Sequence, residues 1–119
     1  MKYVDGFLLA VPTKNLADYR KMSVAAGKVW RKYGALEYVE AVADDLEVKF
    51  GLSFKKLVKP KRGETVVFSW IVFKSRAHRD QVNQKVMTDP SLRKIMEKGP
   101  MPFDLKRMSY GGFKFLVEG

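Results

Sequence analysis

A nine-residue apolar run, Thr65 to Phe73, constrains the fold of this chain more than any other stretch. Eight of its nine residues are β-branched or aromatic and none is charged, a composition typical of a strand. A strand that is solvated on one face alternates polar and apolar residues, whereas this run is apolar on both faces. The sequence therefore predicts a central strand that is covered on both sides.

Three further strands are predicted around this run. They span residues 3–11, 35–43 and 106–117, and the polar content of the second one favours a position at a sheet edge. A pair of glycines, Gly111-Gly112, predicts a bulge or a close backbone approach in the last strand. Within the long connection 44–64, residues 53–58 are expected to form a helical turn or a short strand.

Helical periodicity predicts three helices in two other regions of the chain. A helix is predicted over residues 13–33, capped by Thr13 or Asn15 and stopped by Gly34. A second helix is predicted after Ser75, and a short one after Asp89, where Pro90 takes the first helical position.

The resulting order, β-α-β-β-α-β, predicts the α+β, ferredoxin-like fold: a four-stranded antiparallel sheet with two main helices on one face. A length of 119 residues predicts a single domain over 1–119. Right-handed crossovers place the first and third strands in the middle of the sheet. The central position expected for 65–73 agrees with its composition.

One face of this sheet is left without helices. In the first strand, the even positions hold the smaller residues, Val4, Gly6, Leu8 and Ala10, and we expect that face to lie under the helices. Asp5 would then fall among bulky residues on the opposite face. Because an apolar sheet face of this size is rarely left in water, the sequence predicts a homodimer that packs sheet to sheet.

The bulk composition excludes several classes of protein. The chain has no cysteine, which excludes disulfides and thiolate catalysis. Its start does not resemble a signal peptide, and no apolar run approaches the roughly 20 residues of a membrane span. We therefore expect a cytoplasmic protein without a membrane partner.

A formal charge of +10 is the one unusual bulk property. Between residues 48 and 63 there is no acid, and the basic residues of this stretch are Lys49, Lys55, Lys56, Lys59, Lys61 and Arg62. They form a candidate site for an anion or for nucleic acid. The RNA-recognition module shares the strand order, but Glu64-Thr65-Val66 follows Arg62-Gly63 where that module needs glycine and aromatic residues. A solvated, lysine-rich surface is the alternative interpretation.

Six residues from the first, third and last strands and the preceding loop are candidates for a small-molecule pocket. They are Asp5, Ser69, Trp70, Asp104, Arg107 and Tyr110. A carboxylate in an apolar pocket can act as an acid or base, and Arg107 and Tyr110 could donate to an oxyanion. In the alternative interpretation, Asp5 and Arg107 form a structural ion pair and Asp104 caps its own loop.

No cofactor or metal is predicted. His78 is the single histidine, and a lone histidine without cysteine or paired acids at helical spacing makes no convincing metal site. On a thin apolar helix stripe it is expected to be a packing or surface residue.

Four stretches resemble the small bacterial YbaA-like family, whose function is unknown. They are residues 3–7 (YVDGF), 67–70 (VFSW), 101–104 (MPFD) and 106–113 (KRMSYGGF), and the resemblance runs from end to end. The resemblance implies a ferredoxin-like subunit of the dimeric α+β barrel type, and it carries no catalytic residue. Residues 44–63 are the part that resembles this family least.

Three classes of function remain open from the sequence. The protein is an enzyme-like subunit with a small-molecule pocket, a basic binding module, or a structural or regulatory dimer. Neither the reaction nor the ligand follows from these residues alone.

Overall fold

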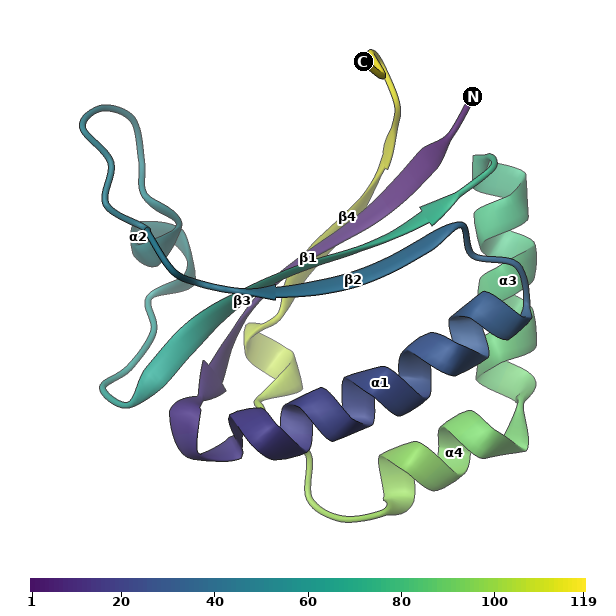
Figure 1. Ribbon diagram of the computed structural model, residues 1–119, viewed down its shortest axis with the longest axis horizontal. Coiled ribbons are helices and arrows are strands. Elements are labelled where there is room, and N and C mark those ends of the chain that lie inside the picture. The colour runs from purple at the N-terminus through teal and green to yellow at the C-terminus, as the bar shows by residue number, and fades with distance from the viewer.

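The computed structural model describes residues 1–119 and shows one antiparallel sheet with helices on one side (Figure 1). Its strands are β1 (Tyr3–Pro12), β2 (Glu37–Val42), β3 (Glu64–Phe73) and β4 (Ser109–Lys114). The strand order is β2-β3-β1-β4. The predicted ferredoxin-like fold is therefore confirmed, with β1 and β3 in the middle and β2 at an edge.

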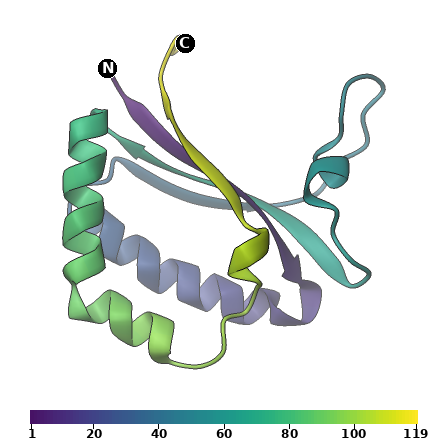
Figure 2. The same cartoon turned by 180° about the vertical axis from the view of Figure 1, so that it is seen from behind.

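Three helices lie on one side of this sheet: α1 (Leu16–Lys32), α3 (Arg76–Thr88) and α4 (Pro90–Glu97). The fourth, α2 (Phe54–Val58), belongs to a protruding excursion between β2 and β3 (Figure 2). The two ends of the chain lie side by side, because the backbone N–H of Phe115 donates to the carbonyl of Lys2 at 2.9 Å.

The helix starts and stops follow the predicted residues with one exception. Ser75 and Asp89 accept hydrogen bonds from the first turns of α3 and α4, as expected of N-caps. Gly34 ends α1 with a φ of 111°. Neither Thr13 nor Asn15 caps α1 through its side chain. A 3-10 turn over Thr13–Asn15 begins the helix instead, and the Asn15 amide donates to the carbonyl of Pro102 at 3.1 Å.

The last strand is shorter than predicted. Instead of spanning 106–117 it begins at Ser109, after a 3-10 turn over Leu105–Arg107, and ends at Lys114. Gly112 marks a close approach: a Cβ added there would lie 2.4 Å from the Tyr3 hydroxyl oxygen. The tail beyond β4 exposes its apolar residues, with Leu116 at 93%.

The prediction for the faces of β1 is wrong. The bulky odd positions, with Asp5, Phe7 and Leu9, face the helices, and the small even positions lie on the open side. Because α1 and α3 do not press closely on this sheet, long side chains are needed to reach them. On the other side Gly6 pairs with Trp70, so that the smallest residue stands beside the largest.

Two apolar clusters join the sheet to its helices. The larger combines Ile71 and Phe73 of β3 with Val29 of α1 and Val82 and Val86 of α3. The smaller lies at the other end of the sheet and combines Leu9, Val11, Tyr19 and Val67. Between these two anchored ends the helices stand away from the sheet.

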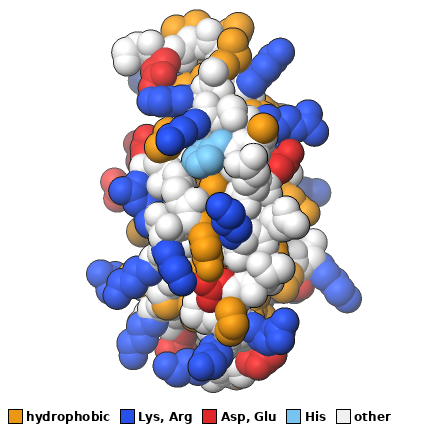
Figure 3. Space-filling model, turned by 90° about the vertical axis from the view of Figure 1, so that its right-hand side faces the viewer, with side chains coloured by type: hydrophobic (Ala, Val, Ile, Leu, Met, Phe, Trp, Pro, Cys, Tyr) orange, Lys and Arg blue, Asp and Glu red, His pale blue; other side chains and the backbone are white.

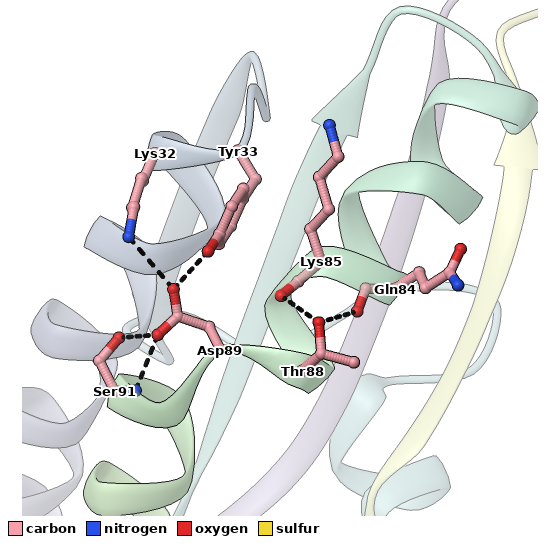
Figure 4. Close-up of polar contacts among 7 residues, drawn as sticks. All are labelled: Lys32, Tyr33, Gln84, Lys85, Thr88, Asp89 and Ser91. Atoms are coloured by element: carbon pink, nitrogen blue, oxygen red, sulfur yellow. Dashed lines mark hydrogen bonds and ion pairs between the residues drawn. The ribbon is translucent and has the colours of Figure 1, made fainter.

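The corner between α3 and α4 is fixed by Asp89 (Figure 4). Its carboxylate accepts hydrogen bonds from the backbone N–H and hydroxyl of Ser91 and from the hydroxyl of Tyr33 on α1, and it pairs with Lys32 at 3.2 Å. These hydrogen bonds hold the pKa of Asp89 well below its usual range. Asp89 thereby joins all three helices.

The single histidine packs as expected. His78 lies edge-on to Phe73, and its Nδ1 accepts the backbone N–H of Lys74 at 3.0 Å. Burial lowers the pKa of His78, and Lys74 and Lys85 add to this effect. Figure 3 shows the side of the molecule that carries α3, with the half-buried histidine visible among cations spread over the whole face.

Residues 44–63, here called the basic arm, protrude beyond the end of the sheet. The predicted turn within it is α2, capped by Ser53 and ended by Lys59 at a φ of 52°. The Phe54 ring packs edge-on against Phe68 of β3, with 5.9 Å between the centroids. Most of the rest of the arm is exposed, and Phe50 is 90% exposed.

Candidate functional site

A cavity of about 510 Å³ lies between the sheet and α1, α3 and α4. Twenty-six residues line it, of which 18 are hydrophobic. They include five of the six methionines of the chain: Met22, Met87, Met96, Met101 and Met108. Thioether side chains are flexible and polarisable, so the wall of this cavity can adapt to the shape of a ligand.

Asp5 forms the first polar group of the cavity wall. It is 6% exposed, and its Oδ1 accepts a hydrogen bond from the Arg79 guanidinium at 2.8 Å. Arg79 also pairs with Asp80 and lies over the ring of Tyr3 at 4.9 Å from its centroid. Burial raises the pKa of Asp5, although Arg79 and the hydrogen-bonding side chain of Asn83 oppose this effect. Asp5 is thus a buried carboxyl group whose pKa lies above its usual value.

Glu40 of β2 forms the second polar group. It accepts hydrogen bonds from the Tyr19 hydroxyl, at 2.8 and 3.0 Å from its two oxygens, and from the Ser23 hydroxyl. Tyr19 and Ser23 lie one turn apart on the inner face of α1. Burial and the nearby Glu40 raise the pKa values of Tyr19 and Tyr38, so both phenols stay protonated and Tyr19 remains a donor.

A second hollow of about 750 Å³, the outer groove, runs between α1 and the edge strand β2. It shares Tyr19, Ser23, Tyr38 and Glu40 with the cavity. Gly27 allows α1 to approach β2 there, because a Cβ at this position would lie 2.7 Å from the ring of Tyr38. The Glu40 group therefore stands between two hollows.

Only part of the predicted pocket set comes together. Asp5, Ser69 and Tyr110 line the cavity, and the Tyr110 ring stacks on Phe7. Trp70 also borders it, but its ring contacts Phe68 and its Nε1 donates to Glu37 on the open side of the sheet.

Asp104 and Arg107 lie outside the cavity. The predicted ion pair between Asp5 and Arg107 is wrong, because Arg107 pairs with Glu64 at 2.7 Å and donates to the carbonyl of Lys59. Asp104 accepts the backbone N–H of Lys106 at 3.0 Å, so it caps its own turn as the structural interpretation expected. Arg107 thereby links the start of β4 to the base of the basic arm.

The sequence reasoning missed Arg79, Asn83 and Glu40. A signal was present, since Arg79 and Asn83 lie at i and i+4 and flank the apolar stripe of Val82 and Val86 on α3. Glu40 shares its strand face with Tyr38, and the polar content of this strand was used only to place it at a sheet edge. Polar residues beside an apolar stripe are the pattern that could have identified all three.

The open face of the sheet is the side without helices, and it carries mainly apolar side chains. They are Val4, Leu8 and Ala10 of β1, Val66, Phe68, Trp70 and Val72 of β3, Val39 and Ala41 of β2, and Phe113 of β4. Phe68 is 41% exposed and Phe113 is 63% exposed. Within a single subunit, this face is covered at one end by Phe54.

The candidate anion-binding residues all lie on the basic arm with exposed side chains: Lys49, Lys55, Lys56, Lys59, Lys61 and Arg62. None of them forms an ion pair. None of the helices has the length and apolar character needed to cross a bilayer.

Comparisons with known proteins agree with the predicted family. Residues 2–105 match the family model described as a protein of unknown function, DUF1428. The chain is 44% identical over 118 residues to the uncharacterized protein YbaA of Escherichia coli K12 and to that of Shigella flexneri, and the match covers 99% of each chain.

Solved structures show the same fold at low sequence identity. An uncharacterized NIPSNAP domain protein from Burkholderia xenovorans superposes with a TM-score of 0.57 and 11% identity, over 97% of this chain and 95% of that one. A dimeric ferredoxin-like protein from an uncultured marine organism superposes with a TM-score of 0.54 and 11% identity, over 99% of this chain and 98% of that one. These two similarities show only that the fold is shared. The family match and the 44% identity show more: this chain belongs to the DUF1428 family, together with the YbaA proteins.

Proposed function

We propose that the protein binds a small, largely apolar organic molecule in the cavity between the sheet and the helices, and that it acts on this molecule without metal or thiol. The observation that carries the proposal is the cavity itself, a hollow of about 510 Å³ whose mostly hydrophobic wall contains the buried carboxyl group of Asp5. Ligand sites typically combine an apolar lining with a few placed polar groups.

Asp5 is the group with the properties of an acid or base. Its raised pKa brings proton exchange closer to neutral pH. The Arg79 guanidinium lies 2.8 Å from Asp5 Oδ1, and this ion pair fixes the orientation of the carboxyl group. Asn83 is itself held by a hydrogen bond from the Trp30 Nε1 at 3.0 Å. Such support keeps one carboxyl oxygen in a defined position toward a ligand.

We propose further that two subunits pair through the open face, as the sequence predicts. The apolar character of this face and the exposure of Phe68 and Phe113 support the pairing, because monomeric proteins rarely expose large contiguous apolar surface. The dimeric ferredoxin-like protein of the same fold is a precedent for such assembly. The cavity lies on the opposite side of the sheet, so pairing leaves it accessible.

The ligand proposal is tested by looking for a bound molecule and by filling the cavity. Native mass spectrometry of the purified protein should detect a small molecule in wild type. Replacing Ser69, which is 8% exposed and lines the cavity, by phenylalanine should abolish its retention. Ala77→Phe is the matched control because Ala77 is exposed on α3 and lines neither hollow.

A role of Asp5 in chemistry is tested separately. Asp5→Asn preserves size and hydrogen bonding, so a catalytic role predicts that turnover of the identified ligand is lost while the variant folds and still binds it. Unchanged turnover in a folded Asp5→Asn variant would leave Asp5 a structural residue. If no small molecule is retained or bound by any variant, the ligand proposal fails, and the basic binding module and the structural or regulatory dimer are left as the alternatives.

The basic arm supports a second candidate function, the binding of phosphate groups without sequence preference. Six exposed cations without a paired acid favour it. Retention on heparin or RNA at about 150 mM salt should be lost when Lys55, Lys56, Lys59 and Lys61 are replaced by glutamine. Replacing Lys28, Lys85, Lys94 and Lys98 on the helices is the control with the same change in charge.

A further inference from the structure

Several hydrogen-bond donors around the cavity are already engaged. Tyr19 and Ser23 both donate to Glu40, and the Nε1 of Trp30 donates to Asn83. Arg79 donates to Asp5 and Asp80. The polar groups left to a ligand are the hydroxyls of Ser69, Tyr38 and Tyr110 and the carboxylate oxygens, which accept hydrogen bonds and never donate them when ionised. A ligand that matches this cavity brings donors of its own.

Glu40 is the carboxylate of the cavity wall that has no cationic partner. Two hydroxyl groups occupy part of its roughly four acceptor positions. No cation neutralises it: the five ion pairs of the structure involve Glu118, Asp89, Asp5, Asp80 and Glu64. A half-buried charge without a partner costs free energy. The lack of a cation beside Glu40 is unusual in a protein whose net charge is +10.

Aromatic rings surround this carboxylate. Tyr19 contacts it directly, Tyr38 lies two residues away on the same strand face, and the Trp30 ring packs on Tyr38 with 6.0 Å between centroids. Phe103 packs edge-on against Tyr19 at 5.5 Å. Aromatic faces attract cations, and clusters of them are a recurring means of binding organic ammonium groups.

We propose that the Glu40 corner of the cavity binds the ammonium group of an amphipathic organic amine, whose apolar body lies against the methionines. This inference deepens the proposed function and rests on the cavity being the ligand site. The ammonium donates to Glu40 and lies against the rings of Tyr19, Tyr38 and Trp30. From strand spacing and register, Asp5 lies roughly 12 Å from Glu40, so the far end of a small amine reaches toward Asp5.

Other charges face this corner as well. Arg20, Lys28 and Arg31 border the outer groove beyond Glu40. Arg20 and Lys28 are exposed, so their repulsion of a bound cation is screened by solvent. Arg31 is occupied by the carbonyls of Ala35 and Leu36. These cations oppose entry of an amine through the outer groove, and the proposal therefore places the ammonium on the cavity side of Glu40.

Three probes of similar size and different charge test the proposal. They are 2-phenylethylammonium, the neutral 2-phenylethanol and the anionic phenylacetate, titrated at pH 7 into protein with isotope-labelled methionine methyl groups. The methyl resonances of the five cavity methionines report binding inside the cavity, and Met1, which is 81% exposed and lies outside it, is an internal reference.

The expected result is that the ammonium probe binds at least about tenfold more tightly than the alcohol, with phenylacetate weakest. Glu40→Gln retains an oxygen that can accept from Tyr19 and Ser23 but removes the charge, so it should lower the affinity for the ammonium probe to about that for the alcohol. Glu37→Gln is the matched control: the same substitution on the same strand, at a side chain that instead accepts from Trp70 on the open face.

Two results would overturn the inference while sparing the cavity as a ligand site. In the first, the alcohol or phenylacetate binds wild type as tightly as the ammonium probe. In the second, Glu37→Gln reduces ammonium binding as much as Glu40→Gln. If none of the three probes shifts the cavity methyl resonances, the cavity and the inference fail together. If the Glu40→Gln variant does not fold, the order of the affinities of the three probes for the wild-type protein still tests the inference.

Discussion

The two faces of one sheet differ in chemistry although the same strands supply both. On the helix side, Asp5, Ser69 and Glu40 place one polar group on each of three neighbouring strands, within an apolar wall. On the open side, the corresponding positions are apolar, and the polar contact between Glu37 and Trp70 joins the edge strand β2 to β3. Strand alternation assigns successive residues to opposite faces, so one run of sequence can serve a site and an assembly surface.

This difference indicates a division of roles. A face used for pairing gains from continuous apolar surface, because each buried polar group there would need a partner. A cavity for ligands needs a few polar groups at fixed places, and these are supported by Arg79, Tyr19 and Ser23 from the helices. Four predictions test this division.

The largest effect is expected from a charge on the open face. Phe68→Lys should leave the subunit folded, since Phe68 is 41% exposed, but should weaken dimerisation by about 100-fold or more, because an unpaired buried charge costs roughly 3–5 kcal/mol. Sedimentation velocity at micromolar concentration measures this. Val24→Lys, at a comparably exposed residue of α1, should pair like wild type. A wild-type protein that stays monomeric would contradict the assignment of this face.

Breaking the buried ion pair of the cavity should have the next largest effect. Arg79→Met leaves the Asp5 carboxylate buried without its partner and should reduce the free energy of unfolding by about 3 kcal/mol. Urea unfolding measures the loss. The double variant Asp5→Asn/Arg79→Met should recover most of it. Lys2→Met, which breaks the exposed pair with Glu118, is the control and should change little. Equal losses for both single variants would contradict the burial argument.

A smaller effect is expected where α1 approaches β2. Gly27→Ala gains up to about 1 kcal/mol of helix propensity, but its Cβ would lie 2.7 Å from the Tyr38 ring, and overpacking costs about 1–3 kcal/mol. We expect a net loss of about 1 kcal/mol in urea unfolding. Gly99→Ala, with open space around its Cβ, should not destabilise. A stabilised Gly27→Ala variant would mean that the Tyr38 ring moves freely.

The smallest effects concern pH, and two carboxylates should act with opposite sign. Burial raises the pKa of Asp5, so its charged form weakens the fold as pH rises above its unfolded value of about 4. The pKa of Asp89 is held low by Ser91 and Tyr33, so its contribution is present above pH ~4 and is lost as pH falls through its folded pKa.

Urea unfolding between pH 3 and 7 checks both signs. Relative to wild type, Asp5→Asn should become more stable with rising pH, whereas Asp89→Asn should become less stable. The double variant carries neither group and should show the flattest profile of the four proteins. Profiles with the same sign for both single variants would contradict the opposed environments of the two carboxylates.

The sequence was sufficient for the central strand, the element order, the edge position of β2 and the caps Ser75 and Asp89. Each of these depends on periodicity or on a short motif within a few residues. The site was accessible only in part: Asp5, Ser69 and Tyr110 were identified, whereas Arg79 and Glu40 were not. Both looked like ordinary surface charges, because their partners come from distant elements, Arg79 lying 74 residues from Asp5.

The alternation along β1 and β3 was determined by the sequence alone, since strand geometry turns every second residue to the same face. Which face meets the helices was decided by the tertiary structure, because turning a strand over exchanges its two faces without changing its pattern. The helices settle the choice through their distance from the sheet: they stand far enough away that long side chains such as Phe7 and Leu9 must reach them. Asp5 is on the cavity side for that reason.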